Sequence, residues 1–370
     1  MMMKIRQRRI VLQKPRRLFL LILVFISVIM AGTAKLVEFP NEGRDFLKLD
    51  SYITEKMNKH LVPGLSMVIL DDQKTIYRKG FGVKNARTGE PVDVNTVFQA
   101  ASFSKTLTAY AAMLLVEREK LALDTPLNHY MKRPYIPDPE NANRITLRMI
   151  LSHTSGLSND SDGGDRKVYF TPGSQFSYSG AGFRYLQEVI VNITGMPFER
   201  FMKQAIFEPL DMNSSSFAFS KKFQPLIATG HEAGVAFPID KKEVNAAYSL
   251  LSTPGDMAKF IKEVVRPTLL KPETVAQMLQ PTVKWQKNIY WGLGFGILKS
   301  PNEDFFWHWG NNYYYCSFLI VSKKSNQGVV IMTNGNTGMK LAERLAMKVV
   351  NSYFCKPGAG LNRETFDFIQ

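Results

Sequence analysis

Strand-like segments stand near both ends of this chain, with helical segments between them, and this order restricts the possible folds more than any other feature. The runs from Leu65 to Leu70 and from Thr75 to Phe81, separated by the turn-prone Asp71-Asp72-Gln73, predict a β-hairpin. Strand signals return only late in the chain, at Gly292 to Leu298, Phe305 to Trp309, Ser317 to Ser322 and Gly328 to Thr333. The pattern predicts an α/β (α+β) fold with one antiparallel sheet built from both termini.

Helical periodicity surrounds and separates these strands. Apolar residues recur at helical spacing from Phe46 to Met57, before the hairpin, and from Met339 to Tyr353, after the last strand. The middle of the chain adds helical segments at Thr106 to Glu119, Ala181 to Ile193 and Phe198 to Phe207. Because no repeat or inter-domain linker interrupts this part, we expect residues 46–370 to form one domain. That domain combines a sheet flanked by helices with an inserted, mostly helical lobe.

The first 34 residues carry a topology signal. Seven Lys or Arg residues and no acidic residue precede Leu18, and residues 18–34 are almost entirely apolar or small. This order is typical of a secretory signal peptide cleaved after Ala34, but 17 apolar residues also reach the lower limit for a membrane anchor. Either way, we expect a basic cytoplasmic head at 1–17, a linker at 35–45 and a domain outside the cytoplasm. It is membrane-anchored and faces outward if the leader stays, and periplasmic or extracellular if the leader is cleaved.

Composition excludes several classes of protein. The net charge is +15, but without the basic head about +8 is spread along the chain with no basic run interleaved with aromatic residues, so we expect no nucleic-acid partner. Two cysteines, Cys316 and Cys355, are too few for a disulfide scaffold or a cysteine-based zinc site, and their pairing is left open. We expect no metal and no cofactor.

The segment from Gln99 to Thr106 opens a helix and holds the first candidate site residues. Ser102 and Lys105 are three residues apart, so both side chains lie on one side of a helix and the amine can approach the hydroxyl. A serine nucleophile needs a base, and a lysine is a base only when burial or the positive helix end keeps it neutral. This spacing is weak evidence by itself. The alternative is Ser102 as a helix cap and Lys105 as a solvated residue.

Two later segments add polar groups. Tyr178 lies in a Gly- and Ser-rich loop before a helix, where a tyrosine can move protons if neighbouring cations stabilise its phenolate, or can simply pack. On the strand from Phe305 onward, His308 is followed by Gly310, which removes a side chain where a substrate lies close to the backbone. The next amide, on Asn311, can donate to an oxyanion together with the amide of Ser102. His153, in a turn-rich loop, is expected to be structural.

These three segments, in this order, resemble the serine β-lactamase and penicillin-binding-protein-like superfamily, and above all its class C β-lactamase-related branch of esterases and D-aminopeptidases. Leu151 to Leu157, Phe207 to Met212 and Trp291 to Gly296 are also similar to segments of that branch. The resemblance extends from about Phe46 to the last helix. It implies a β-lactamase/DD-peptidase-like fold and a serine hydrolase that acts through a covalent acyl-enzyme.

The resemblance also implies roles for individual residues. Ser102 would be acylated, Lys105 and Tyr178 would share the proton transfers, and His308 would stand where relatives have the lysine of the third motif. Gly310 and Asn311 would line the oxyanion side of the substrate.

Two departures from the family pattern bear on the substrate. Gly180 stands where many relatives have an asparagine that contacts a peptide-like or β-lactam side chain. His308 replaces a permanent cation, although it can be charged at mildly acid pH. We therefore expect an ester or a D-amino-acid amide of the cell envelope as the small-molecule substrate. A penicillin-binding DD-peptidase or β-lactamase, and a non-catalytic envelope protein that binds ligands or senses antibiotics, are the alternatives.

Overall fold

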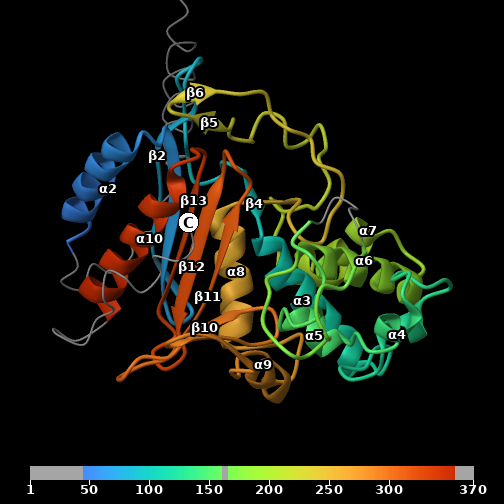
Figure 1. The fold of residues 1–370 in the computed structure, drawn as a ribbon. Helices are drawn as coiled ribbons and strands as arrows, with labels where there is room; N and C mark the ends of the chain where they lie inside the picture. The colour runs from blue at the N-terminus through green and yellow to red at the C-terminus, as the bar shows by residue number, and fades with distance from the viewer. Residues whose placement is uncertain (1–44, 161–165, 355–370) are drawn as a thin grey trace, which may run out of the picture. The chain divides into compact units, whose positions relative to one another are not determined.

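A nine-stranded antiparallel sheet forms the centre of the part of the chain that the computed structural model describes, residues 45–160 and 166–354 (Figure 1). The strands lie in the order β3-β2-β1-β13-β12-β11-β10-β9-β8. β1 (Gly64–Asp71) pairs with β2 (Lys74–Asn85) on one side and with β13 (Gly328–Thr333) on the other. The prediction of one sheet built from both ends of the chain is confirmed. The other strands are β3 (Glu90–Pro91), β8 (Val283–Gln286), β9 (Ile289–Trp291), β10 (Gly296–Leu298), β11 (Phe305–Asn311) and β12 (Cys316–Ser322).

Helices cover both faces of this sheet. α2 (Phe46–His60) and α10 (Gly338–Val349) pack on one face, and α8 (Pro254–Val265) packs on the other (Figure 1). Side chains of β1 alternate accordingly, since Met67 belongs to the apolar cluster under α2 and α10 whereas Val68 belongs to the cluster on the opposite side. A strand buried on both faces needs apolar residues throughout, which explains the nearly continuous apolar runs of the central strands.

Most of the segment between β3 and β8, apart from α8 on the sheet, forms the inserted lobe, which is mostly helical as predicted. Its longest helices are α3 (Phe103–Glu117) and α6 (Gly180–Thr194), and the short strands β4 (Phe98–Ala101) and β7 (Leu250–Ser252) pair with each other beside them. Ser179 caps α6 by accepting a hydrogen bond from the amide of Gly182. The remaining elements are the 3₁₀ turn Leu127–Tyr130, α4 (Pro139–Ala142), α5 (Leu147–Leu151), α7 (Phe198–Met202), β5 (His231–Glu232), β6 (Val235–Ala236) and α9 (Pro272–Met278).

Most predicted helices and strands occur within a few residues of their expected bounds, and three differ in form. The predicted helix from Met339 to Tyr353 is α10 continued by a π turn, Val350–Phe354. The predicted helix from Phe198 to Phe207 is α7 continued by a wider π turn, Lys203–Phe207. The predicted strand from Gly292 to Leu298 is only partly confirmed, because its first residues form a turn after β9 and the strand β10 begins at Gly296. Gly294 makes this turn at φ +90°, a conformation that favours glycine.

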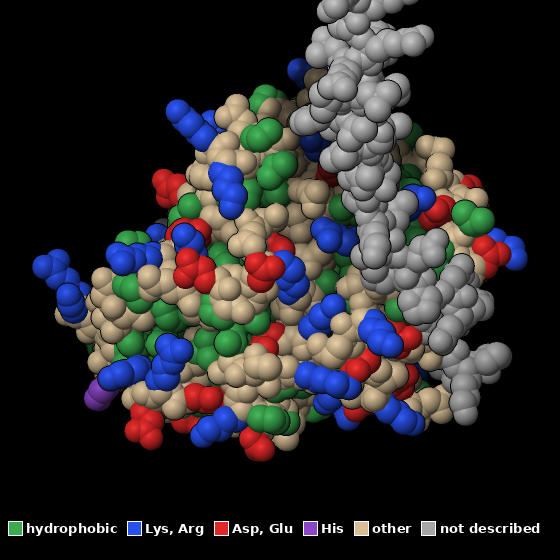
Figure 2. Space-filling view, turned by 180° about the vertical axis from the view of Figure 1, so that it is seen from behind, with side chains coloured by type: hydrophobic (Ala, Val, Ile, Leu, Met, Phe, Trp, Pro, Cys, Tyr) green, Lys and Arg blue, Asp and Glu red, His purple; other side chains and the backbone are tan. Residues whose placement is uncertain are grey.

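Several predictions fall outside the described residues: the basic head, the leader at 18–34, most of the linker and Cys355. Within 45–160 and 166–354, no helix is both long and apolar enough to cross a membrane. Cys316 is a buried free thiol on β12. On the face seen in Figure 2, Lys and Arg side chains are interspersed with Asp and Glu and form no single basic tract.

The turn at Gly294 supplies a test of how tightly the sheet packs on α3. A Cβ atom there would lie 2.3 Å from the Cβ of Ala109, one helical turn after Lys105, whereas at Gly89, also at positive φ, it would meet nothing within 4 Å. We expect Gly89→Ala to lower the free energy of unfolding by about 1 kcal/mol through backbone strain alone. Gly294→Ala should lower it by about 3 kcal/mol, because overpacking adds to the same strain. Denaturant unfolding of both variants checks this, and equal losses would contradict the close packing.

Candidate active site

Ser102 lies at the junction between β4 and α3, where the chain turns sharply. The preceding residue, Ala101, has a φ of +51°, which is unusual for a residue with a side chain and turns the strand into the helix. Ser104 fixes this junction, since its hydroxyl donates to the Ala101 carbonyl (2.6 Å) and accepts from the amide of Leu250 on β7 (3.0 Å). Ser102 occupies the N-cap position of α3, but its side chain makes no capping hydrogen bond. Its hydroxyl is therefore available to Lys105.

Lys105 is buried away from water beside this hydroxyl. Its Nζ is 3.1 Å from Ser102 Oγ and 2.8 Å from the carbonyl oxygen of Ala247, and the side chain is 2% exposed. Burial lowers the pKa of Lys105 to about 7, since no carboxylate among the described residues forms an ion pair with it. The alternative of a solvated lysine is wrong. Near neutral pH a large fraction of Lys105 is an uncharged amine that can accept the proton of Ser102.

The acceptor carbonyl of Ala247 is held by residues far away in the sequence. Asn245 Oδ1 accepts from the amide of Ala247 (2.9 Å), and Gln187 Oε1, from α6, accepts from the amide of Ala246 (2.8 Å). The segment from Asn245 to Leu250 is thus tied to α6, while Ser104 ties it to α3. Sequence reasoning missed Ala247, and no side-chain pattern could have revealed it because it acts through its backbone.

Tyr178 comes from the loop before α6 and lies against Lys105. Its ring centre is 4.9 Å from Lys105 Nζ, and its buried hydroxyl makes no hydrogen bond to any described residue. Burial raises the pKa of Tyr178, and interaction with the Ser102 side chain offsets part of this rise without reaching the geometry of a hydrogen bond. Tyr178 is therefore a neutral phenol at neutral pH. Among the described residues, the expected cation beside Tyr178 is Lys105.

His153 fixes the loop that carries Tyr178. This role is structural, as expected, but it acts directly on a candidate site residue. Its carbonyl accepts from the amide of Ser177 (2.8 Å), and its Nδ1 accepts from the amide of Ser179 (3.0 Å), so both neighbours of Tyr178 are fixed. The rings of His153 and Tyr178 are 4.2 Å apart. Burial, followed by the charges of Lys105 and His308, holds the pKa of His153 well below its usual value.

His308 points from β11 toward the same cluster and is fully buried. Its Nδ1 lies 2.6 Å from the carbonyl oxygen of Trp309, and its ring centre is 6.4 Å from that of Tyr178. Burial lowers the pKa of His308 to about 3; the Trp309 carbonyl opposes this shift and the charge of Lys105 adds to it. The expectation that His308 can be charged at mildly acid pH is therefore wrong.

The predicted substrate-contact residues lie around this cluster. A Cβ at Gly310 would come within 2.3 Å of the Ala100 carbonyl, so this glycine leaves room for β4 just before Ser102 and not only for a substrate. Asn311 ends β11 on the surface, and Gly180 is the buried first residue of α6. Contact of Gly180, Gly310 and the Asn311 amide with a substrate stays a prediction.

Aromatic side chains enclose the cluster, and this enclosure was not predicted. Trp291 lies 5.0 Å from His153, 5.4 Å from His308 and 5.8 Å from Tyr178, measured between ring centres. Trp309 lies 4.7 Å from Tyr178. These rings displace water, which explains the shifted pKa values above.

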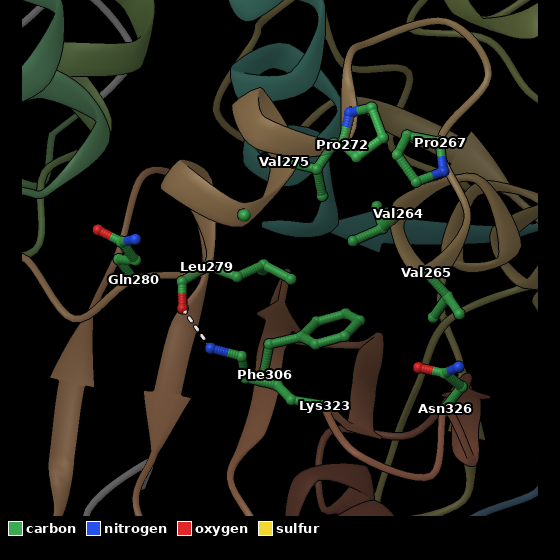
Figure 3. A pocket seen from close by; sticks show the side chains of 11 residues that line it. Val264, Val265, Pro267, Pro272, Val275, Leu279, Gln280, Phe306, Lys323 and Asn326 are labelled. Atoms are coloured by element: carbon green, nitrogen blue, oxygen red, sulfur yellow. Dashed lines mark hydrogen bonds between the residues drawn. The ribbon is translucent and has the colours of Figure 1, made fainter.

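A separate cavity of about 350 Å³ lies between α9, the end of α8 and β11 (Figure 3). Its lining is mainly apolar and includes Phe306, and Lys323 Nζ donates to the carbonyl of Leu279 (2.9 Å) at its edge. None of the predicted site residues lines this cavity.

Comparison with known proteins agrees with this geometry. A sequence model of the family described as Beta-lactamase matches residues 49–352. "Protein flp" of Staphylococcus aureus (strain MRSA252) is 24% identical over 338 residues, which cover 82% of this chain but only 66% of that protein, just under two thirds of its length. The "Beta-lactamase" of Escherichia coli (strain K12) is 25% identical over 68% of this chain and 71% of its own. The octameric penicillin-binding protein homologue from Pyrococcus abyssi has a TM-score of 0.73 at 25% identity, covering 83% of this chain and 77% of that one.

The buried amine of Lys105 should reduce stability in a pH-dependent way. Its pKa is about 7 in the folded chain and 10.5 when unfolded, so the unfolded state binds more protons between these values and stability rises with pH there. Lys105→Met removes this cost and leaves the Ala247 carbonyl unpaired. We expect the variant to be more stable than the parent by about 2 kcal/mol below pH 7. The gain should shrink as the pH rises and become a loss toward about pH 10, where most of the cost of the buried charge has disappeared.

Thermal unfolding of both proteins across this pH range measures the difference. Lys120→Met, at an exposed lysine just after α3, is the matched control. A Lys105→Met variant that is less stable than the parent at every pH would contradict the desolvated amine.

Proposed function

Because the chain belongs to the beta-lactamase family and is, in general terms, a serine hydrolase, we propose that it cleaves uncharged esters or D-amino-acid amides of the cell envelope. The reaction passes through an acyl-enzyme on Ser102. The observation that carries the proposal is the 3.1 Å contact between Ser102 Oγ and a buried Lys105 Nζ whose pKa is about 7.

The first step uses this contact directly. Ser102 Oγ attacks the acyl carbon while its proton passes to the uncharged amine of Lys105, and the carbonyl electron pair moves onto the oxygen. The backbone amides of Ser102 and Asn311 are the proposed donors to that oxyanion. The Ala247 carbonyl, 2.8 Å from Nζ, accepts an N–H from Lys105 in both protonation states and keeps the amine in place.

Departure of the leaving group uses Tyr178. Once Lys105 has become an ammonium, its charge lies 4.9 Å from the tyrosine ring and stabilises a phenolate. Tyr178 can then give its proton to the departing oxygen or nitrogen and recover a proton from Lys105. The amine is thereby uncharged again and can activate the water that hydrolyses the acyl-enzyme.

The charges at the site support an uncharged substrate. His308 is a neutral imidazole where a lysine would attract a substrate carboxylate, and Gly180 offers no side-chain amide to a peptide-like group. A DD-peptidase or β-lactamase needs contacts of both kinds, so we place these activities second. The alternative of a non-catalytic ligand-binding or sensor protein does not account for a lysine kept neutral beside Ser102.

We further propose that residues 18–34 export the domain, either as a cleaved signal peptide or as an outward-facing membrane anchor. The basic head at 1–17 and the apolar run that follows it support this location.

Ser102→Ala should abolish hydrolysis of a short-chain nitrophenyl ester and labelling by a fluorophosphonate, because the nucleophile is lost; we expect at least a 10³-fold decrease, as an order of magnitude. In the parent protein, kcat/KM should rise with pH through about 7, since Lys105 must lose its proton to act as a base. The same ester should be turned over faster than a chromogenic cephalosporin.

Ser51→Ala, on the exposed face of α2, is the control for the loss of a hydroxyl. If neither the fluorophosphonate nor a fluorescent penicillin labels Ser102 and no ester is cleaved, the non-catalytic alternative replaces the proposal. Faster turnover of the cephalosporin would favour the β-lactamase alternative.

A further inference from the structure

The two buried histidines beside Tyr178 carry their protons on opposite ring nitrogens, and their backbone partners determine which. The Trp309 carbonyl, 2.6 Å from His308 Nδ1, can only accept a hydrogen bond. His308 Nδ1 therefore carries the proton. In the neutral ring, His308 Nε2 then bears a lone pair and is a hydrogen-bond acceptor.

His153 has the reverse arrangement. The amide of Ser179, 3.0 Å from His153 Nδ1, can only donate, so His153 Nδ1 carries the lone pair. In the neutral ring the proton is on His153 Nε2, which is a donor. Protonating His153 on both nitrogens would set two N–H groups against each other and break the contact that fixes Ser179.

Three buried polar atoms of this cluster lack a partner among the described residues. They are the Nε2 atoms of His153 and His308 and the hydroxyl of Tyr178. Buried polar atoms are nearly always hydrogen-bonded, so these three atoms beside Lys105 are available for hydrogen bonds with one another. The hydroxyl of Tyr178 has a proton to donate, and His308 Nε2 is an acceptor. The ring centres of Tyr178 and His308 are 6.4 Å apart.

Resting on the proposed function, we propose that His153 and His308 are positioning residues that hold Tyr178 as a neutral proton donor. His153 fixes the backbone on both sides of Tyr178 through its carbonyl and Nδ1. His308 Nε2 is the proposed acceptor for the phenol while Lys105 is uncharged, and the phenol turns to the leaving group once Lys105 carries its proton.

The neighbouring charges support neutral histidines. The titratable groups that face His308 are Lys105 from α3, Tyr178 from the loop before α6 and His153 from the loop after α5. Among residues 45–160 and 166–354, none of the ion pairs includes His308 or any of the three groups that face it. A charged His308 would thus be a second cation near Lys105 with no counter-ion. It would also donate to Tyr178 and favour the phenolate, which reverses the direction of proton transfer.

This arrangement makes the acidity of Tyr178 depend on one event. While Lys105 is neutral, nothing charged stabilises the phenolate and Tyr178 keeps its proton. When Lys105 takes the proton of Ser102, its charge appears beside the ring and Tyr178 becomes acidic as the leaving group needs a proton.

The tautomers can be tested without any substrate, by ¹⁵N NMR of the full chain labelled at histidine. We expect a proton on Nδ1 of His308 and on Nε2 of His153, with both rings neutral from about pH 5 to about pH 8. His308→Gln and His153→Gln assign the signals, and exposed His129 is the reference. A cationic His308 within this range, or the same tautomer in both rings, would overturn the proposal. If the tautomers are as expected but no ester is cleaved, the proposed function fails, whereas different tautomers in an active enzyme overturn only the positioning of Tyr178.

The kinetic test compares three substitutions at His308 with a nitrophenyl ester. His308→Phe keeps the ring shape without an acceptor, and we expect kcat to fall about 100-fold with little change in KM. His308→Gln, which keeps a neutral acceptor oxygen, should recover at least a tenth of the parent kcat, as an order of magnitude. His308→Lys adds a cation that stabilises the phenolate, so its pH profile should gain a falling alkaline limb absent from the parent.

Thermal melting confirms that each variant is folded before its rates are compared. A Phe variant that raises KM and keeps kcat would overturn the proposal, because His308 would then contact the substrate and not Tyr178. Equal loss in the Phe and Gln variants would also overturn it.

Discussion

The candidate active site depends on keeping one amine out of water. Lys105 can act as a base near neutral pH only if its surroundings make the ammonium unfavourable, so the sheet and the inserted lobe must close over the start of α3. Every residue of α3 from Phe103 to Leu115 is buried, which is far more than an amphipathic surface helix requires. Two glycines make this closure possible, Gly310 where β11 meets β4 and Gly294 where the β9–β10 turn meets α3. Packing and reactivity are thus set by the same contacts.

Much of the fold could be predicted because its signals are local. Central strands buried on both faces are read as apolar runs, and the helices as apolar residues at helical spacing. The strand prediction for Gly292 to Gly296 also failed for a local reason. Its glycines alternate with apolar residues as they would on a strand, and only the backbone conformation at Gly294 reveals the turn.

Only those contacts of the site that follow from the spacing of residues along the sequence could be predicted. Ser102 and Lys105 are one helical turn apart, so their contact follows from the helix itself. The carbonyl of Ala247 and the two backbone contacts of His153 come from segments distant from the residues they support, and they use atoms that every residue has. The neutrality of His308 could not be predicted either, since it results from burial among aromatic rings brought together by the fold.

The pairing of β1 with β13 also sets the order in which the molecule is completed. The hairpin of β1 and β2 is synthesised early, and the edge of β1 that β13 covers stays unpaired until almost the whole described chain has been made. Contacts between such distant segments slow folding. In a chain that stops before β11, the start of α3 is exposed to water. In such a fragment Ser102 and Lys105 are both present, but the lysine is an ordinary ammonium. The uncharged amine beside Ser102 is therefore formed only after the last strands have packed.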